Sequence, residues 1–155
     1  MKMVYFCCNI NRIRISSYYM NQFDSLYEIE QELYKIRMMT TISLRDIKNA
    51  EEKLNVMVMY NIERHQEYSF ENLLKYVKIL GKRLLLDGRP VESMTDIGTI
   101  LKEKRTAAGL SVLSAFSQTQ IQPKSIAKME SGKQYRKSTL AKYISYYNLR
   151  FTLDN

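Results

Sequence analysis

The chain of 155 residues contains no tryptophan, one histidine, two cysteines, five glycines and two prolines. So little glycine and proline excludes a collagen-like or linker-dominated architecture. Cys7 and Cys8 are adjacent, and adjacent cysteines rarely form a structural disulfide, so the sequence indicates a reducing compartment. No apolar run approaches the roughly 20 residues of a membrane span, and the short apolar run near the N-terminus lacks a signal-peptide cleavage pattern. We therefore expect a cytoplasmic protein with no membrane partner.

The sequence also lacks the patterns of common catalytic and metal sites. Neither G-x-x-x-x-G-K-[ST] nor G-x-G-x-x-G occurs, so no phosphate-cradling glycine loop is predicted. A Cys–His nucleophile pair or a metal site would have to join Cys7 or Cys8 to His65, which is distant in the sequence and lacks the usual ligand spacing. Adjacent Glu51 and Glu52 are more typical of a solvated helix face than of an acid–base dyad. We expect no enzymatic activity, no metal and no cofactor.

Basic charge is abundant and unevenly distributed. The net charge is +8, of which residues 91–155 contribute +5, residues 1–20 contribute +3 and residues 21–90 contribute about zero. A local surplus of this kind is typical of proteins that bind a polyanion, most often nucleic acid. A soluble protein with a high isoelectric point is the alternative that composition leaves open.

An internal repeat organises the chain. One constant shift places residues 28–37 on residues 96–105. After a slip of one position, a second shift, here called the repeat shift, places Glu63 on Glu130 and residues 83–88 on residues 150–155. The order of these matches predicts a tandem duplication with a first half (residues 21–88), a linker (residues 89–94) and a second half (residues 95–155). Residues 1–20 lie outside the repeat and form either a tail or a strand.

Each half is predicted to be mainly α-helical. In the second half we expect Thr95 or Asp96 to cap a helix that ends at Gly109, because polar caps and terminal glycine mark helix ends. Three more helices are expected, at residues 111–117, 123–131 and 139–147, the last capped by Ser138. Each half ends in a short strand with alternating polarity, at residues 83–86 and 150–153. We expect these two strands to pair antiparallel within one chain, making a monomeric pseudo-dimer; pairing between chains, making a homodimer, is the alternative.

Residues 110–133 carry a resemblance to a known family. The segment L-S-V-L-S-A-F-S-Q-T-Q-I-Q-P-K-S-I-A-K-M-E-S-G-K resembles the helix-turn-helix of the XRE or phage-repressor (lambda repressor-like) family, and the register holds without a gap from Leu110 to Glu130. Val112, Ala115-Phe116, Gln120 and Pro123 depart from the family pattern. The resemblance implies two tandem helix-turn-helix bundles, the first degenerate. It further implies a sequence-specific regulator that binds double-stranded DNA, with repressor activity and, as one variant, an antitoxin-type role.

The expected DNA-reading helix follows Gln122. Ile126 and Met129 are three residues apart and are expected to face the core, whereas Lys124 and Lys128 share the opposite face. Lysine and serine can donate to base edges or to phosphate, and a loop with three cations follows. A merely solvated helix face is the alternative. The predicted DNA-contacting residues are Gln122, Lys124, Ser125, Lys128, Lys133, Gln134, Tyr135 and Arg136.

The first half is apolar where the second half is basic. Its third helix exposes Val56, Met57 and Tyr60, and a methionine-rich surface adapts well to protein partners. The sequence leaves three interpretations of this face open: it is buried under residues 1–20, it contacts a protein such as a toxin-like partner, or it retains a DNA contact. For the whole chain, the alternative to a DNA-binding regulator is a protein-interaction module built on degenerate helix-turn-helix repeats.

Overall fold

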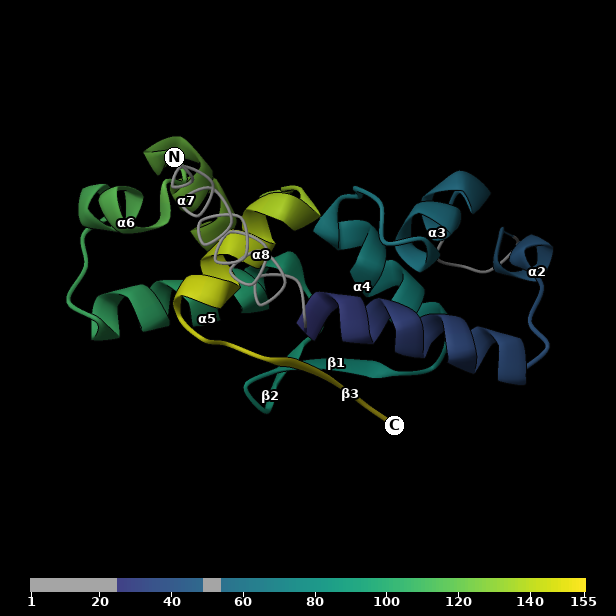
Figure 1. The fold of residues 1–155 in the computed structure, drawn as a ribbon. Helices are drawn as coiled ribbons and strands as arrows, with labels where there is room; N and C mark the ends of the chain where they lie inside the picture. Colours follow the sequence, from purple (N-terminus) through teal and green to yellow (C-terminus); the bar gives the residue numbers. More distant parts are fainter. Residues whose placement is uncertain (1–24, 49–53) are drawn as a thin grey trace, which may run out of the picture.

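A computed structural model describes residues 25–48 and 54–155 of the chain (Figure 1). The expected N-terminal segment (residues 1–20), the cysteines within it and the Glu51-Glu52 pair lie outside the described residues.

The described part is mainly helical with one small antiparallel sheet, as expected for the fold class. A helix of residues 25–39 opens the first half and packs buried Ile29 and Leu33, one turn apart, against the core. The remaining elements of the first half are α2 (Leu44–Lys48), α3 (Val56–Glu63), α4 (Phe70–Ile79) and β1 (Arg83–Leu86). There follow β2 (Arg89–Val91), α5 (Met94–Ala107), α6 (Val112–Thr119), α7 (Pro123–Glu130), α8 (Lys137–Tyr146) and β3 (Phe151–Asp154).

Local sequence explains most helix ends. Gly109 follows α5 with a φ of 70°, a left-handed conformation that glycine adopts at little cost. Ser111 caps α6 by accepting from the backbone N–H of Ser114, and Pro123 occupies the first turn of α7. The expected cap of α5 at Thr95 or Asp96 is wrong. Ser93 is the cap, and Asp96 completes a capping box by accepting from the backbone N–H of Ser93.

The start of α8 also differs from the expectation. The helix begins at Lys137 and its N-cap is Arg136, with no side-chain capping bond, so Ser138 does not cap it. Glu67, from the first half, takes over this role because its carboxylate accepts from the backbone N–H of Ser138 at 3.1 Å. A contact between sequence-distant residues thus overrides the local capping signal.

The predicted linker contains a strand. Asp87 and Gly88 both have positive φ (49° and 75°) and form the tight turn of a hairpin that pairs β1 with β2. Such turns favour Asp-Gly because both central residues are left-handed. Only Glu92 and Ser93 separate this hairpin from α5, so the linker forms an ordered edge of the sheet.

The two halves pair antiparallel within the chain, as predicted. In the β1–β3 ladder, Leu84 faces Leu153 and Leu86 faces Phe151, on either side of the central pair Leu85 and Thr152. Leu85 and Thr152 are themselves matched by the repeat shift. A second contact has the same symmetry, because an antiparallel bridge joins Ser69 to Arg136, which the repeat shift also matches. The halves are therefore related by a local two-fold axis through both contacts.

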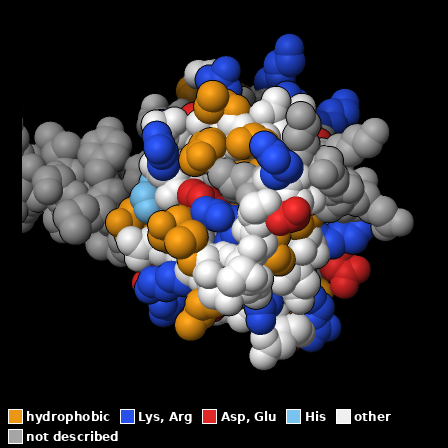
Figure 2. Space-filling model, turned by 90° about the vertical axis from the view of Figure 1, so that its right-hand side faces the viewer, with side chains coloured by type: hydrophobic (Ala, Val, Ile, Leu, Met, Phe, Trp, Pro, Cys, Tyr) orange, Lys and Arg blue, Asp and Glu red, His pale blue; other side chains and the backbone are white. Residues whose placement is uncertain are grey.

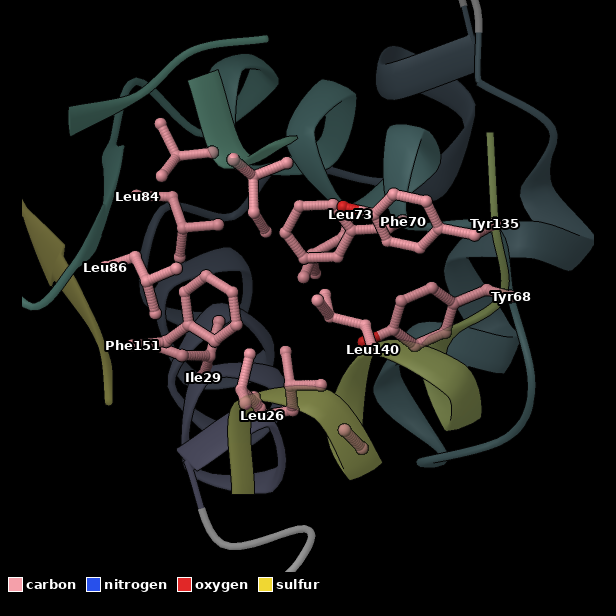
Figure 3. Close-up of a cluster of buried hydrophobic side chains, with 14 of the residues drawn as sticks. Leu26, Ile29, Tyr68, Phe70, Leu73, Leu84, Leu86, Tyr135, Leu140 and Phe151 are labelled. Carbon is pink, nitrogen blue, oxygen red and sulfur yellow. The ribbon is translucent and has the colours of Figure 1, made fainter. Parts of the chain in front are cut away.

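The core is continuous across this axis. Phe70, fully buried on α4, has its ring centroid 5.9 Å from that of Tyr135 and 5.6 Å from that of Phe151, both from the second half (Figure 3). Burial of a side chain of this size contributes about 1.5–3 kcal/mol to folding. The backbone reinforces the contact, because the N–H of Phe70 donates to the carbonyl of Tyr135. The two halves consequently form one packed body.

Candidate nucleic-acid interface

An internal ion pair fixes the orientation of α7. The Arg105 guanidinium donates to both carboxylate oxygens of Glu130, at 2.6 and 2.8 Å, and the Tyr143 hydroxyl donates to the same carboxylate at 2.7 Å. The hydrogen bonds to Glu130 raise the pKa of Arg105, and burial raises the pKa of Tyr143. A bidentate arginine–carboxylate pair is geometrically specific. It ties the end of α7 to α5, and the Tyr143 hydroxyl ties it to α8.

The first half repeats this arrangement. The Arg37 guanidinium donates to Glu63, the residue that ends α3, and the Tyr76 hydroxyl donates to the same carboxylate. Arg37 and Glu63 are the residues that the repeat matches to Arg105 and Glu130. The matched positions therefore mark an internal anchor for α3 and α7. The sequence pattern pointed to the right residues without revealing that they contact one another.

A glycine brings α7 close to α5. A Cβ atom at Gly98 would lie 2.8 Å from the carbonyl oxygens of both Met129 and Glu130. Contacts that short do not occur for real Cβ atoms, so only glycine allows the last turn of α7 to sit at this distance. The first-half residue matched to Gly98 is Glu30, so the approach of α7 to α5 is particular to the second half.

The outward face of α7 is basic. Ile126 and Met129 are fully buried, as predicted, while Lys124 and Lys128 are exposed on the other side of the helix. The turn before α7 places Gln120 in the left-handed conformation, with a φ of 58°, which glycine adopts at less cost. The polar–apolar division expected for a groove-reading helix is therefore present.

The cations on and directly after α7 differ in their pairing from several other cations of the second half. Lys124 and Lys128 on the helix, with Lys133 and Arg136 in the loop after it, are exposed and have no ion pair within the described residues. By contrast, Lys104 pairs with Asp87 on the surface, and Lys137 is buried with an acidic partner. The unpaired charges are free to bind an external anion.

The other predicted contact residues differ in their exposure. Gln122 and Gln134 are exposed beside the cations, and Ser125 is half-buried. The prediction that Tyr135 contacts DNA is wrong: its side chain is only 7% exposed and its ring stacks on Phe70. The repeat shift matches Tyr135 to Tyr68, which is also buried. A comparison of the halves would have indicated a core position.

The corresponding face of the first half is apolar and exposed. On α3, Met57 is 65% exposed and Tyr60 40% exposed, whereas Val56 is half-buried. Arg64, after the helix, lies over the Tyr60 ring at 5.2 Å from its centroid. Figure 2 views the end of the molecule built by the first half, where apolar side chains lie exposed among charged ones. Whether residues 1–20 cover this face lies outside the described part of the chain.

A buried polar cluster, which the sequence did not predict, joins the halves. The Glu30 carboxylate is fully buried and contacts Lys137 Nζ at 2.5 Å, His65 Nδ1 at 2.6 Å and the Tyr68 hydroxyl at 2.6 Å. Lys137 also donates to the His65 carbonyl at 3.2 Å. The histidine, at the turn after α3, thus belongs to a contact between the halves. Within residues 25–48 and 54–155, no three His, Cys, Asp or Glu side chains gather as metal ligands would.

The chain has no match among known proteins: neither family models, nor curated proteins, nor solved structures resemble it closely enough to be matched. None of the helices in the described ranges has the length and apolar character needed to span a membrane.

Proposed function

We propose that the protein is a sequence-specific double-stranded DNA-binding regulator, a repressor that acts by occupying its operator. The helix-turn-helix would be α6 and α7, a unit of the lambda repressor-like kind. The observation that carries the proposal is a set of four exposed cations on α7 and the loop after it, which have no ion pair with the part of the chain that the structure describes. The inner face of the same helix is fully buried. The sequence resemblance over residues 110–133 supports the same conclusion.

In this proposal α7 enters the major groove and α6 lies across the DNA backbone. Lys124 and Lys128 sit on the outward face and would donate to guanine O6 and N7 or to phosphate. Lys133 and Arg136 would contact phosphates and so set the register of the protein on the duplex. The ion pair of Arg105 with Glu130 contributes by holding α7 rigidly, because preorganised contacts lose less entropy on binding.

A second candidate function concerns the first half. The exposed Met57 and Tyr60 favour a protein contact on α3, as in an antitoxin that binds both DNA and a toxin. The two functions are compatible because they use different helices. Co-purification of a partner without a DNA shift would favour the interaction module over the regulator.

The test selects bound duplexes from random DNA and then titrates the selected duplex with variants. Lys124→Ala and Lys128→Ala should each weaken binding by about 1–3 kcal/mol, or roughly 5- to 150-fold, if the contact is to a base. Lys102→Ala on α5 is the matched control, because it removes the same charge from an exposed site on another helix. Wild-type affinity in both α7 variants would overturn the assignment of the interface.

A further inference from the structure

The local two-fold axis places α3 and α7 in equivalent positions. Both helices lie on the side of the molecule opposite the sheet (Figure 1). The repeat shift relates their first residues, Val56 and Pro123, and also their last, Glu63 and Glu130, so they are equivalent along the chain as well. A symmetric pair of helix-turn-helix units in this arrangement reads two matching half-sites, which makes the operator palindromic.

The side chains do not follow this symmetry. At the positions matched by the repeat shift, the first half has no cation where the second half has four, and it has a carboxylate where the second half has an amide. Lys124, Lys128, Lys133 and Arg136 correspond to Met57, Asn61, Gln66 and Ser69, and Gln134 corresponds to Glu67. At these matched positions the first half therefore has no cation for the phosphate contacts proposed for the second. The cation nearest to α3, Arg64, lies over the Tyr60 ring and has no counterpart among the four.

The structure also favours the pairing of a first half with a second half over the pairing of two second halves. The Glu30–Lys137 ion pair joins them on one side of the axis. On the other side of the axis the equivalent ion pair is missing. The repeat matches Lys137 to Phe70 and Glu30 to Gly98, so neither charge is present there. Pairing two second halves would bury two lysines without a carboxylate, which is strongly unfavourable. Every molecule therefore presents one basic and one non-basic unit on the same side.

We propose that the operator of this protein is asymmetric, with one half-site read by the α7 unit and no matching inverted half-site under α3. The proposal rests on the proposed function and specifies the class of DNA that this function would recognise. The covalent link between the halves makes such asymmetry possible, because a homodimer of identical units would restore the palindrome.

Selection from random duplexes tests the proposal on the full-length chain. The expected consensus is a single, non-palindromic half-site, and Met57→Ala or Tyr60→Ala should leave it unchanged. The converse variant combines Met57→Lys, Asn61→Lys and Gln66→Lys, which restores three of the four missing cations. It should steepen the slope of log affinity against log salt by about two to three, given about 0.9 per added phosphate contact.

The outcomes separate this inference from the proposed function. An inverted-repeat consensus, or a changed consensus in Met57→Ala, would overturn the asymmetric operator while leaving DNA binding intact. An unchanged salt slope in the triple-lysine variant would show that α3 does not face the duplex, and would overturn the part of the proposal that places the first half over DNA. No binding to any duplex by the wild-type chain would overturn both proposals.

Discussion

Removal of the Glu30 charge should be among the most destabilising single changes in the protein. The Glu30 side chain has no solvent-accessible surface, and that of its partner Lys137 is 6% exposed. Glu30→Gln keeps the size of the side chain and an acceptor for the Tyr68 hydroxyl. It leaves the Lys137 ammonium in the interior with no carboxylate.

The magnitude follows from that uncompensated charge. Breaking a buried pair by removing one partner costs about 3–5 kcal/mol, because the remaining charge keeps its desolvation penalty. For a chain of this size, 1 kcal/mol corresponds to roughly 2–4 °C in Tm. The expected fall in Tm is therefore roughly 6–20 °C. Replacing both partners, as in Glu30→Leu with Lys137→Met, should recover much of this loss, because neither charge is then buried.

Thermal and urea unfolding followed by far-ultraviolet circular dichroism measure the effect. Glu28→Gln is the matched control, because Glu28 lies on the same helix and also pairs across the halves, with Arg150, but at the exposed surface. An exposed pair of that kind contributes about 0–1 kcal/mol. Equal losses in Glu30→Gln and Glu28→Gln would refute the claim that the Glu30 pair is buried in the folded protein.

Three further predictions concern single sites. Gly98→Ala should destabilise the fold by about 1–3 kcal/mol, because the new Cβ meets backbone oxygens of α7 that cannot move aside. An unchanged midpoint of urea unfolding would show that α7 does not lie this close to α5. Gln120→Gly should stabilise the fold by up to about 1 kcal/mol, because glycine adopts the left-handed conformation of this position without strain. Gln118→Gly within α6 should instead cost about 1 kcal/mol. Changes of the same sign in both variants would contradict the turn geometry. Burial raises the pKa of Tyr76 and Tyr143 above the ordinary 10.0, so their stabilising contribution is complete below pH 10.0 and is lost as the pH rises further. Tyrosinate absorbance from these residues should appear only together with unfolding, and their ionisation in the folded protein would contradict their burial.

The sequence predicted the elements that local chemistry determines. Apolar spacing and capping residues predicted α5, α6 and α7 to within a few residues, and the inward positions of Ile126 and Met129 were confirmed. The internal repeat also predicted the antiparallel pairing of β1 with β3, because each half ends in a strand that needs a partner.

Contacts between distant residues account for the errors. Glu67 caps α8 from the other half, so the local Ser138 signal failed, and Tyr135 is buried by Phe70 across the axis. The Asp87-Gly88 turn was visible in the sequence, and its hairpin could have been predicted. The buried cluster around Glu30 could not have been predicted, because its lysine, Lys137, stands at a position that the repeat matches to Phe70.

The proposed binding of the DNA backbone by the exposed cations of the second half can be measured through the salt dependence of affinity. The measurement is fluorescence anisotropy of a selected duplex, titrated at several salt concentrations with wild type, with Lys133→Ala plus Arg136→Ala, and with the control pair Lys102→Ala plus Lys142→Ala. Both pairs remove two exposed cations. We expect the first pair to flatten the slope of log affinity against log salt by about two, and the control pair to leave the slope near the wild-type value. Equal slopes in all three proteins, or equal flattening in both variants, would contradict the proposed binding.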